Sequence, residues 1–159
     1  NKAAQTVVIG AHYDHLGWGD ENSLHGGGKA IHNGADDNAS GVAVMLDLAA
    51  RLKNSTLKNN NYLFIAFSGE EKGLWGSNFF SKNPTVESLN YMINMDMVGR
   101  LKEDKSLAVN GTGTAPEWKE VLEKNNAFGF KLVLSESGVG PSDHTSFYNI
   151  GVPAIHFFT

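Results

Sequence analysis

The chain has 159 residues, 41% of them hydrophobic and 19% charged, which is typical of a soluble globular protein with one domain and a substantial core. Its formal net charge of -4 and its lack of a Lys/Arg cluster argue against nucleic acid as a partner. Because it has no cysteine, disulfides, thiolate metal sites and a cysteine nucleophile are excluded. No apolar stretch approaches the ~20 residues that a membrane helix needs, so membrane insertion is not expected.

The first half of the chain predicts two strands and two helices. Residues 6–11 (TVVIGA) are typical of a buried strand, and a long loop rich in Gly, Asn and His follows. Residues 40–54 place their apolar side chains on one face of a helix. The apolar run 61–67 predicts a second strand, and 71–83 predicts a helix. The simplest interpretation of Glu70 and Glu71 is that they favour the start of this helix through its dipole.

The second half continues the alternation of strands and helices. Strands are expected at 91–99, 106–111, 130–136 and 152–158, and helices at 115–126 and 142–149. Ser142 is expected to cap the last, short helix. Strands alternating with helices, several of them apolar on both faces, predict an α/β domain of three layers, doubly wound around a mostly parallel sheet.

Polar side chains gather where these strands end. In an open α/β sheet, ligands bind outside the carboxyl ends of the strands. Each polar residue taken singly has an ordinary explanation, as a turn residue, a helix cap or a hydrogen-bonded histidine. Together at one edge of the sheet they predict a metal site. The candidates are His12, Asp14, His15, Asp36, Asp37, Glu70, Glu71, Asp96, Asp143 and His144.

The donor types indicate which metals would bind. Imidazole and carboxylate without thiolate suit zinc, and also manganese, cobalt or iron. Two histidines and three carboxylates exceed the three protein ligands that a catalytic zinc usually takes. They fit two metals that share a bridging carboxylate and activate a water between them. One of Glu70 and Glu71 would then bind metal, and its neighbour would be free to take the proton of that water.

Five motifs, taken in order, resemble those of a known family. They are AHYD (11–14), GADDNASG (34–41), SGEEKGLWGS (68–77), NMDMVG (94–99) and SDHTSF (142–147). The set is similar to the co-catalytic di-zinc aminopeptidases of metallopeptidase family twenty-eight, to which glutamate carboxypeptidase II and glutaminyl cyclase are related. The resemblance covers nearly the whole chain and implies the zinc-peptidase architecture, two Zn²⁺ ions per chain and a peptide substrate.

The resemblance also implies a role for each metal ligand. His12 and Asp96 correspond to ligands of one zinc, Glu71 and His144 to ligands of the other, and Asp37 to the bridge between them.

Two further acids correspond to residues that act beside the ligands. Asp14 resembles the acid that orients the imidazole of His12. Glu70 resembles the general base that passes a proton from water to the leaving amine. The family further implies a cis peptide bond between Asp37 and Asn38.

Other residues are given weaker roles. His15, His25 and His32 lie in the long loop, where a solvated or supporting role is expected rather than ligation. The aromatic side chains of Trp75, Phe79 and Phe147 could line a substrate pocket, but a place in the core is favoured.

The resulting expectation is a zinc exopeptidase that hydrolyses the N-terminal peptide bond by a metal-bridged hydroxide. Three alternatives stay open: a glutaminyl cyclase-like enzyme with one zinc, a carboxypeptidase or dipeptidase, and a non-catalytic binding core. Residues 1–159 are expected to form a single catalytic domain, truncated at both ends relative to the family, with other domains of a longer parent chain as possible partners. The resemblance implies a secreted or periplasmic protein.

Overall fold

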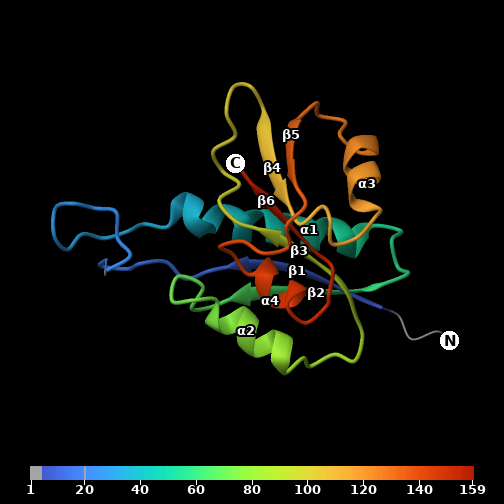
Figure 1. Ribbon diagram of the computed structural model, residues 1–159, viewed down its shortest axis with the longest axis horizontal. Coiled ribbons are helices and arrows are strands. Elements are labelled where there is room, and N and C mark those ends of the chain that lie inside the picture. Colours follow the sequence, from blue (N-terminus) through green and yellow to red (C-terminus); the bar gives the residue numbers. More distant parts are fainter. Residues whose placement is uncertain (1–4, 20) are drawn as a thin grey trace.

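The computed structural model describes residues 5–19 and 21–159, which fold around a six-stranded sheet (Figure 1). The strands are β1 (Thr6–His12), β2 (Asn61–Phe67), β3 (Leu89–Met95), β4 (Ser106–Asn110), β5 (Lys131–Ser135) and β6 (Ala154–Phe158). Their order across the sheet is β2-β1-β3-β6-β4-β5. The pair β4–β6 is antiparallel and the other neighbouring pairs are parallel. The predicted α/β class with a mostly parallel sheet is confirmed.

The helices are α1 (Gly41–Asn54), α2 (Trp75–Lys82), α3 (Trp118–Lys124) and α4 (His144–Tyr148), with a kinked helical turn, η1 (Ala35–Ser40), before α1. None of the helices in the part of the chain that the structure describes has the length and apolarity needed to cross a membrane.

The two faces of the sheet bury alternate side chains of the same strands. On one face, Val8 of β1 packs with Phe147 of α4, and on the other Val7 and Ile9 pack with Met45 of α1. All seven residues of β1 are buried, because successive side chains of a central strand point into different layers. Of the three aromatic residues assigned to the core, Phe147 is fully buried, whereas Trp75 and Phe79 are exposed.

The register of the sheet determines which residues meet at its edge. β1 lies between β2 and β3, with His12 opposite Phe67 and Gly10 opposite Asn94. His12 and Asp96 therefore leave the sheet side by side, two residues beyond the Gly10–Asn94 pair. The chain segment that follows Phe67 carries the two glutamates past the same edge.

The helix predicted at 71–83 begins later than expected. Residues 70–74 form a turn in which the amides of Gly73 and Leu74 both donate to the carbonyl of Glu70, at 2.9 and 3.0 Å. Because α2 starts at Trp75, neither Glu70 nor Glu71 lies in its first turn. The interpretation of these two acids as helix-start residues is therefore wrong.

The SDHTSF motif (142–147) also approaches the candidate site from a different element than expected. β5 is parallel to β4, which is antiparallel to β6, so β5 points away from the edge that carries His12. Asp143 and His144 therefore do not follow a strand that ends at that edge. They reach the region through α4, which packs on the face of the sheet against β6 and β3.

Candidate metal centre

His12, the last residue of β1, lies among carboxylates at the edge of the sheet. Its Nε2 is 3.1 Å from Asp37 Oδ1, 3.3 Å from Asp96 Oδ1 and 4.0 Å from Glu70 Oε2. The donor atoms of His12, Asp37 and Asp96 all lie within 4.8 Å of one another, which is close enough for one ion to contact all three. The structure thus brings together three of the predicted ligands, from β1, η1 and the residue after β3.

A second group of donors lies beside the first. His15 Nδ1 is 2.6 Å from Glu71 Oε1 and 3.6 Å from Asp37 Oδ2, and these donor atoms also lie within 4.8 Å of one another. The sequence predicts only a solvated or supporting role for His15. Its position three residues after His12, in the loop that leaves β1, is the one signal that could have placed it at the centre.

Asp37 belongs to both groups. Its Oδ1 faces His12, while its Oδ2 faces His15. The peptide bond between Asp37 and Asn38 is cis, as the resemblance implies. The side chain of Asn38 ties this segment to the sheet, because its Nδ2 donates to the carbonyl of Met95 at 3.0 Å and its Oδ1 accepts from the amide of Gly41 at 2.9 Å.

The electrostatics of the first group favour a positive charge between its carboxylates. Although burial alone lowers it, the pKa of His12 is raised to about 11 by its hydrogen bonds to Asp37 and Asp96. Burial raises the pKa of Glu70 to about 8, with further contributions from neighbouring acids. Among the described residues, the ion pairs of Asp37, Glu70, Glu71 and Asp96 are all with His12 or His15.

The residues present fit a pair of metal ions. Each group offers one imidazole nitrogen and two carboxylate oxygens, the donor types of catalytic zinc sites with three protein ligands and an open position. The shared carboxylate of Asp37 matches the bridge of a two-metal site. The carboxylates around Nε2 of His12 would favour a cation at this place.

Asp14 contacts His12 mainly through its backbone. His12 Nδ1 is 3.1 Å from the carbonyl oxygen of Asp14 and 3.8 Å from its carboxylate oxygen Oδ1. That carboxylate oxygen instead accepts a hydrogen bond from the amide of Glu70 at 3.3 Å. Asp14 thus lies between the first ligand and the candidate base, with its carbonyl oriented toward the imidazole.

His144 lies in neither group of donors. Its ring is fully buried and stacks on His156 of β6, with ring centroids 4.5 Å apart and an interplanar angle of 3°. Burial, with His156 beside it, lowers the pKa of His144 to about 3, and neither ring nitrogen has a hydrogen-bond partner among the described residues. His156 pairs with Asn94, two residues before Asp96, so this stack lies roughly 7 Å deeper along the sheet than the ligands.

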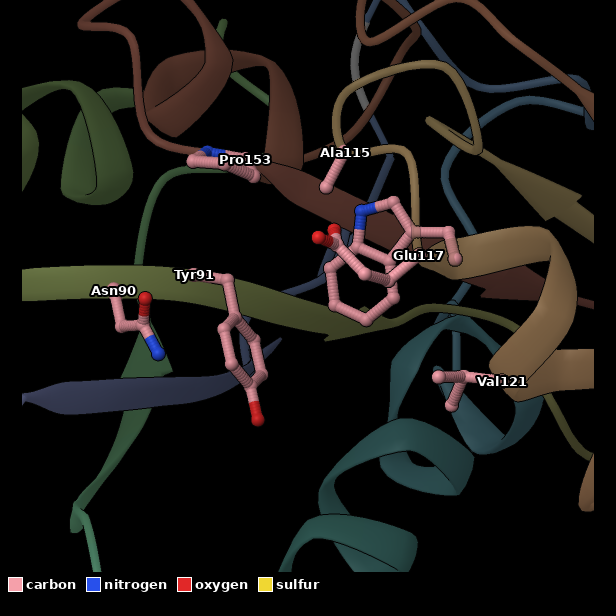
Figure 2. A pocket seen from close by; sticks show the side chains of 7 residues that line it. Asn90, Tyr91, Ala115, Glu117, Val121 and Pro153 are labelled. Atoms are coloured by element: carbon pink, nitrogen blue, oxygen red, sulfur yellow. The ribbon is translucent and has the colours of Figure 1, made fainter.

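A cleft between β3 and α3 lies away from both groups of donors. It has a volume of about 400 Å³ and lies between the first residues of β3, the segment before β6 and α3; Figure 2 shows Asn90, Tyr91, Glu117, Val121 and Pro153 around it. Asn90 and Tyr91 lie near the start of β3, whereas Asp96 follows its end, about 17 Å away along an extended strand. This cleft therefore takes no part in the metal centre.

The comparison with known proteins gives the same family as the five motifs. Residues 1–159 match the model of peptidase family M28. Aminopeptidase YwaD of Bacillus subtilis (strain 168) is 32% identical over 162 residues, which cover 98% of this chain and 32% of that protein. The alkaline phosphatase isozyme conversion protein of Escherichia coli (strain K12) is 34% identical over 128 residues, covering 79% of this chain and 36% of that protein. The chain thus spans about a third of the length of these relatives.

Solved structures show the same fold. BSAP, a zinc aminopeptidase from Bacillus subtilis, matches with a TM-score of 0.78 and 30% identity, over 99% of this chain and 37% of that chain. Glutaminyl cyclase from Porphyromonas gingivalis matches with a TM-score of 0.77 over 99% of this chain and 60% of that chain, but at 22% identity this likeness concerns the fold alone. Because the family model matches residues 1–159, the chain belongs to peptidase family M28.

Proposed function

We propose that this protein is a zinc-dependent aminopeptidase that hydrolyses the N-terminal peptide bond of peptides and binds two zinc ions per chain. The observation that carries the proposal is the position of Asp37, whose two carboxylate oxygens face different histidines, His12 at 3.1 Å and His15 at 3.6 Å. A single carboxylate between two sets of donors is what a two-metal site requires. The first ion would be held by His12, Asp37 and Asp96.

The second ion would be held by Asp37, Glu71 and one histidine. The resemblance assigns that role to His144, whereas His15 is the histidine in contact with Glu71. The two assignments predict different effects of alanine substitution, which are set out in the Discussion.

Glu70 is proposed as the general base. When bound, the two ions supply Lewis-acid chemistry, which lowers the pKa of a water and polarises the substrate carbonyl. The side chain of Glu70 is 10% exposed and its carboxylate lies 4.0 Å from Nε2 of His12, beside the first group and outside both sets of donors. In this proposal Glu70 takes the proton of the attacking water and delivers it to the leaving amine.

The names of the relatives support hydrolysis at the amino terminus of the substrate. YwaD and BSAP carry the name aminopeptidase, as do several fungal relatives named as probable leucine aminopeptidases, one of them from Arthroderma otae at 32% identity. An aminopeptidase would require a free α-amino group on its substrate, whereas a carboxypeptidase would require a free α-carboxylate.

The test uses the complete protein that carries this chain and three forms of one leucyl peptide: free at both ends, acetylated at the amino terminus, and amidated at the carboxyl terminus. We expect the zinc-loaded protein to release leucine from the first and third forms and not from the second. Removal of zinc with a chelator should abolish the release, and zinc should restore it.

Other outcomes would point to the alternatives. Cleavage of the acetylated form but not the amidated form would indicate a carboxypeptidase. Cyclisation of the N-terminal glutamine of a separate glutaminyl peptide, without hydrolysis of the leucyl peptides, would indicate a cyclase. No turnover of any of these peptides would indicate a binding core.

The family resemblance is also the basis for proposing that the protein is secreted or periplasmic. A secreted or periplasmic protein should appear in the medium or in the periplasmic fraction of the source cells. Its recovery in the cytoplasmic fraction would contradict that part of the proposal.

A further inference from the structure

The long loop between β1 and η1 carries three imidazoles that lie in a row. The ring centroids of His25 and His32 are 6.3 Å apart, and those of His32 and His15 are 6.2 Å apart. His15 in turn contacts Glu71 of the second group of donors, with 2.6 Å between Nδ1 and Oε1. The row of rings therefore ends at the candidate metal centre.

The row runs from the surface toward the centre. His25 is exposed, whereas His32 and His15 are half-buried. The loop projects from the body of the molecule (Figure 1), but Asn22 holds it beside the second group, because its Nδ2 donates to the carbonyl oxygen of Glu71 at 3.1 Å. An ion that binds at His25 thus comes directly from solvent and has two further imidazoles between it and the donors of the centre.

The spacing of the rings allows neighbouring imidazoles to share an ion. A zinc ion lies about 2.0–2.1 Å from an imidazole nitrogen, which places the centroid of the ring roughly 3.2 Å from the ion. Two rings on one ion therefore have centroids up to roughly 6.4 Å apart. Both separations in the row, 6.3 and 6.2 Å, fall within this limit, so an ion can pass from one ring to the next without leaving protein donors.

His32, the middle ring, has a lone pair to offer such an ion. Its Nδ1 is 2.8 Å from the carbonyl oxygen of Ala30, which only accepts, so the ring hydrogen is assigned to Nδ1. Its Nε2 then accepts from the hydroxyl of Ser23 at 2.7 Å. Because a hydroxyl hydrogen rotates readily, Ser23 can turn it away and leave the lone pair of Nε2 to a metal ion.

The exposed end of the row opens into a cleft of about 250 Å³. Trp18, Ser23, His25 and Lys29 are among the residues that line it. This volume admits an ion with several of its waters, each of which occupies about 30 Å³ in the liquid. The ammonium of Lys29 would oppose a cation, but its side chain is exposed and can extend into solvent.

We propose that His25 and His32 form an outer metal site, from which ions pass through His15 to the second group of donors. The inference rests on the proposed two-metal centre and concerns how that centre is loaded. Binding at the outer site makes the next step intramolecular, with an effective concentration in the millimolar range for a short connection. Since the free ion in a loading experiment is micromolar, the outer site should accelerate loading without changing the final affinity.

The test is stopped-flow mixing of the metal-free complete protein with micromolar Co²⁺, followed by the visible absorption of the bound ion, together with an equilibrium titration by calorimetry. We expect His25→Ala and His32→Gln to slow the loading of one of the two ions by at least about tenfold. The equilibrium affinity for that ion and the loading of the other ion should be unchanged.

Leu24→Ala is the matched control, because Leu24 is fully exposed beside His25 in the same loop and offers no metal donor. This variant should load both ions as the unsubstituted protein does. Equal slowing in Leu24→Ala would overturn the inference, because the cause would then be the loop and not its imidazoles.

The other outcomes separate the inference from the function on which it rests. If the unsubstituted protein binds two ions and both histidine variants load them at the same rate as it does, the inference is overturned and the metal centre stands. A loss of equilibrium affinity in the histidine variants would also overturn it, because these rings would then be permanent ligands. If the unsubstituted protein binds fewer than two ions, the proposed two-metal centre and this inference both fail.

Discussion

Glu70 and Glu71 are adjacent in the chain but contact different groups. Glu70 lies against the first set of donors, and burial raises its pKa to about 8. Glu71 belongs to the second set, with Oε1 2.6 Å from His15. Burial raises the pKa of both carboxyls, so it is their contacts that distinguish the proposed base from the proposed ligand.

Glutamine at each position should therefore have a different effect. Glu71→Gln exchanges an anionic ligand for a neutral one, so both metal content and turnover should fall. Glu70→Gln should keep both ions and lose turnover by about 10²–10⁴-fold, the contribution of a positioned acid–base group. Metal content and peptide hydrolysis are measured side by side, with Glu123→Gln, at an exposed position of α3, as the control. Loss of metal in Glu70→Gln alone would reverse the two roles.

Alanine at His15 and at His144 should distinguish the two candidates for the second ion. Because His15 contacts Glu71 and Asp37, we expect His15→Ala to lower the affinity for one ion. His144→Ala should instead lower the free energy of unfolding, by roughly 2–5 kcal/mol, because it removes a fully buried ring from its stack on His156. Metal titration and urea unfolding on both variants provide the test. Loss of one ion in His144→Ala, with His15→Ala unchanged, would support the family assignment.

The junction between η1 and α1 holds Asp37 in place through close backbone packing. A Cβ atom on Gly41 would overlap Oδ1 of Asn38 and the carbonyl oxygen of Met95. The backbone carbonyl cannot rotate away as a side chain can, so the start of α1 would have to move from the end of β3. Asp37 lies in the segment that this movement would displace.

We therefore expect Gly41→Ala to lower the free energy of unfolding by about 1–3 kcal/mol, the usual cost of overpacking, despite the better helix propensity of alanine. Metal affinity should fall with it. Gly26→Ala is the control, because a Cβ there meets nothing within 4 Å. Equal stability of the two variants in urea would show that this contact does not restrain α1.

Local patterns predicted the strands better than the ends of the helices. The run 61–67 is β2 residue for residue, because an apolar, β-branched and aromatic segment has few alternatives to a buried strand. The start of α2 was wrong because the amides of Gly73 and Leu74 turn back to Glu70, and Leu74 adopts a positive φ of 61°. No periodicity in the sequence shows such a turn. The antiparallel pairing of β4 with β6 is likewise a long-range choice that a local pattern does not contain.

The convergence of the candidate ligands was predicted to the extent that strand ends determine it. His12, Asp96 and the two glutamates follow neighbouring parallel strands, so their convergence could be inferred from the order of elements. His15 was given only a solvated or supporting role, because a loop residue has no periodicity to place it. The position of His144 depends on how α4 packs against β6, a tertiary contact that motif order does not specify.

Zinc should stabilise the whole fold, because its donors come from segments that are far apart in the chain and meet only in the folded state. A ligand at a hundred times its dissociation constant adds about 2.7 kcal/mol. We expect zinc to raise the melting temperature, and Asp37→Ala to remove most of that gain, since both ions lose a ligand. The comparison is thermal unfolding with and without zinc, with Asp47→Ala, at an exposed position on α1, as the control. A full zinc effect in Asp37→Ala would exclude the bridge.

The central claim is that Asp37 joins two ions in one centre, and the most direct test is the metal content per chain. The complete protein would be purified without chelator, reconstituted with zinc, freed of excess metal and measured by elemental analysis against protein concentration. Two zinc ions per chain, falling to one or none in Asp37→Ala, is the predicted result. One ion or none in the reconstituted, unsubstituted protein would contradict the account.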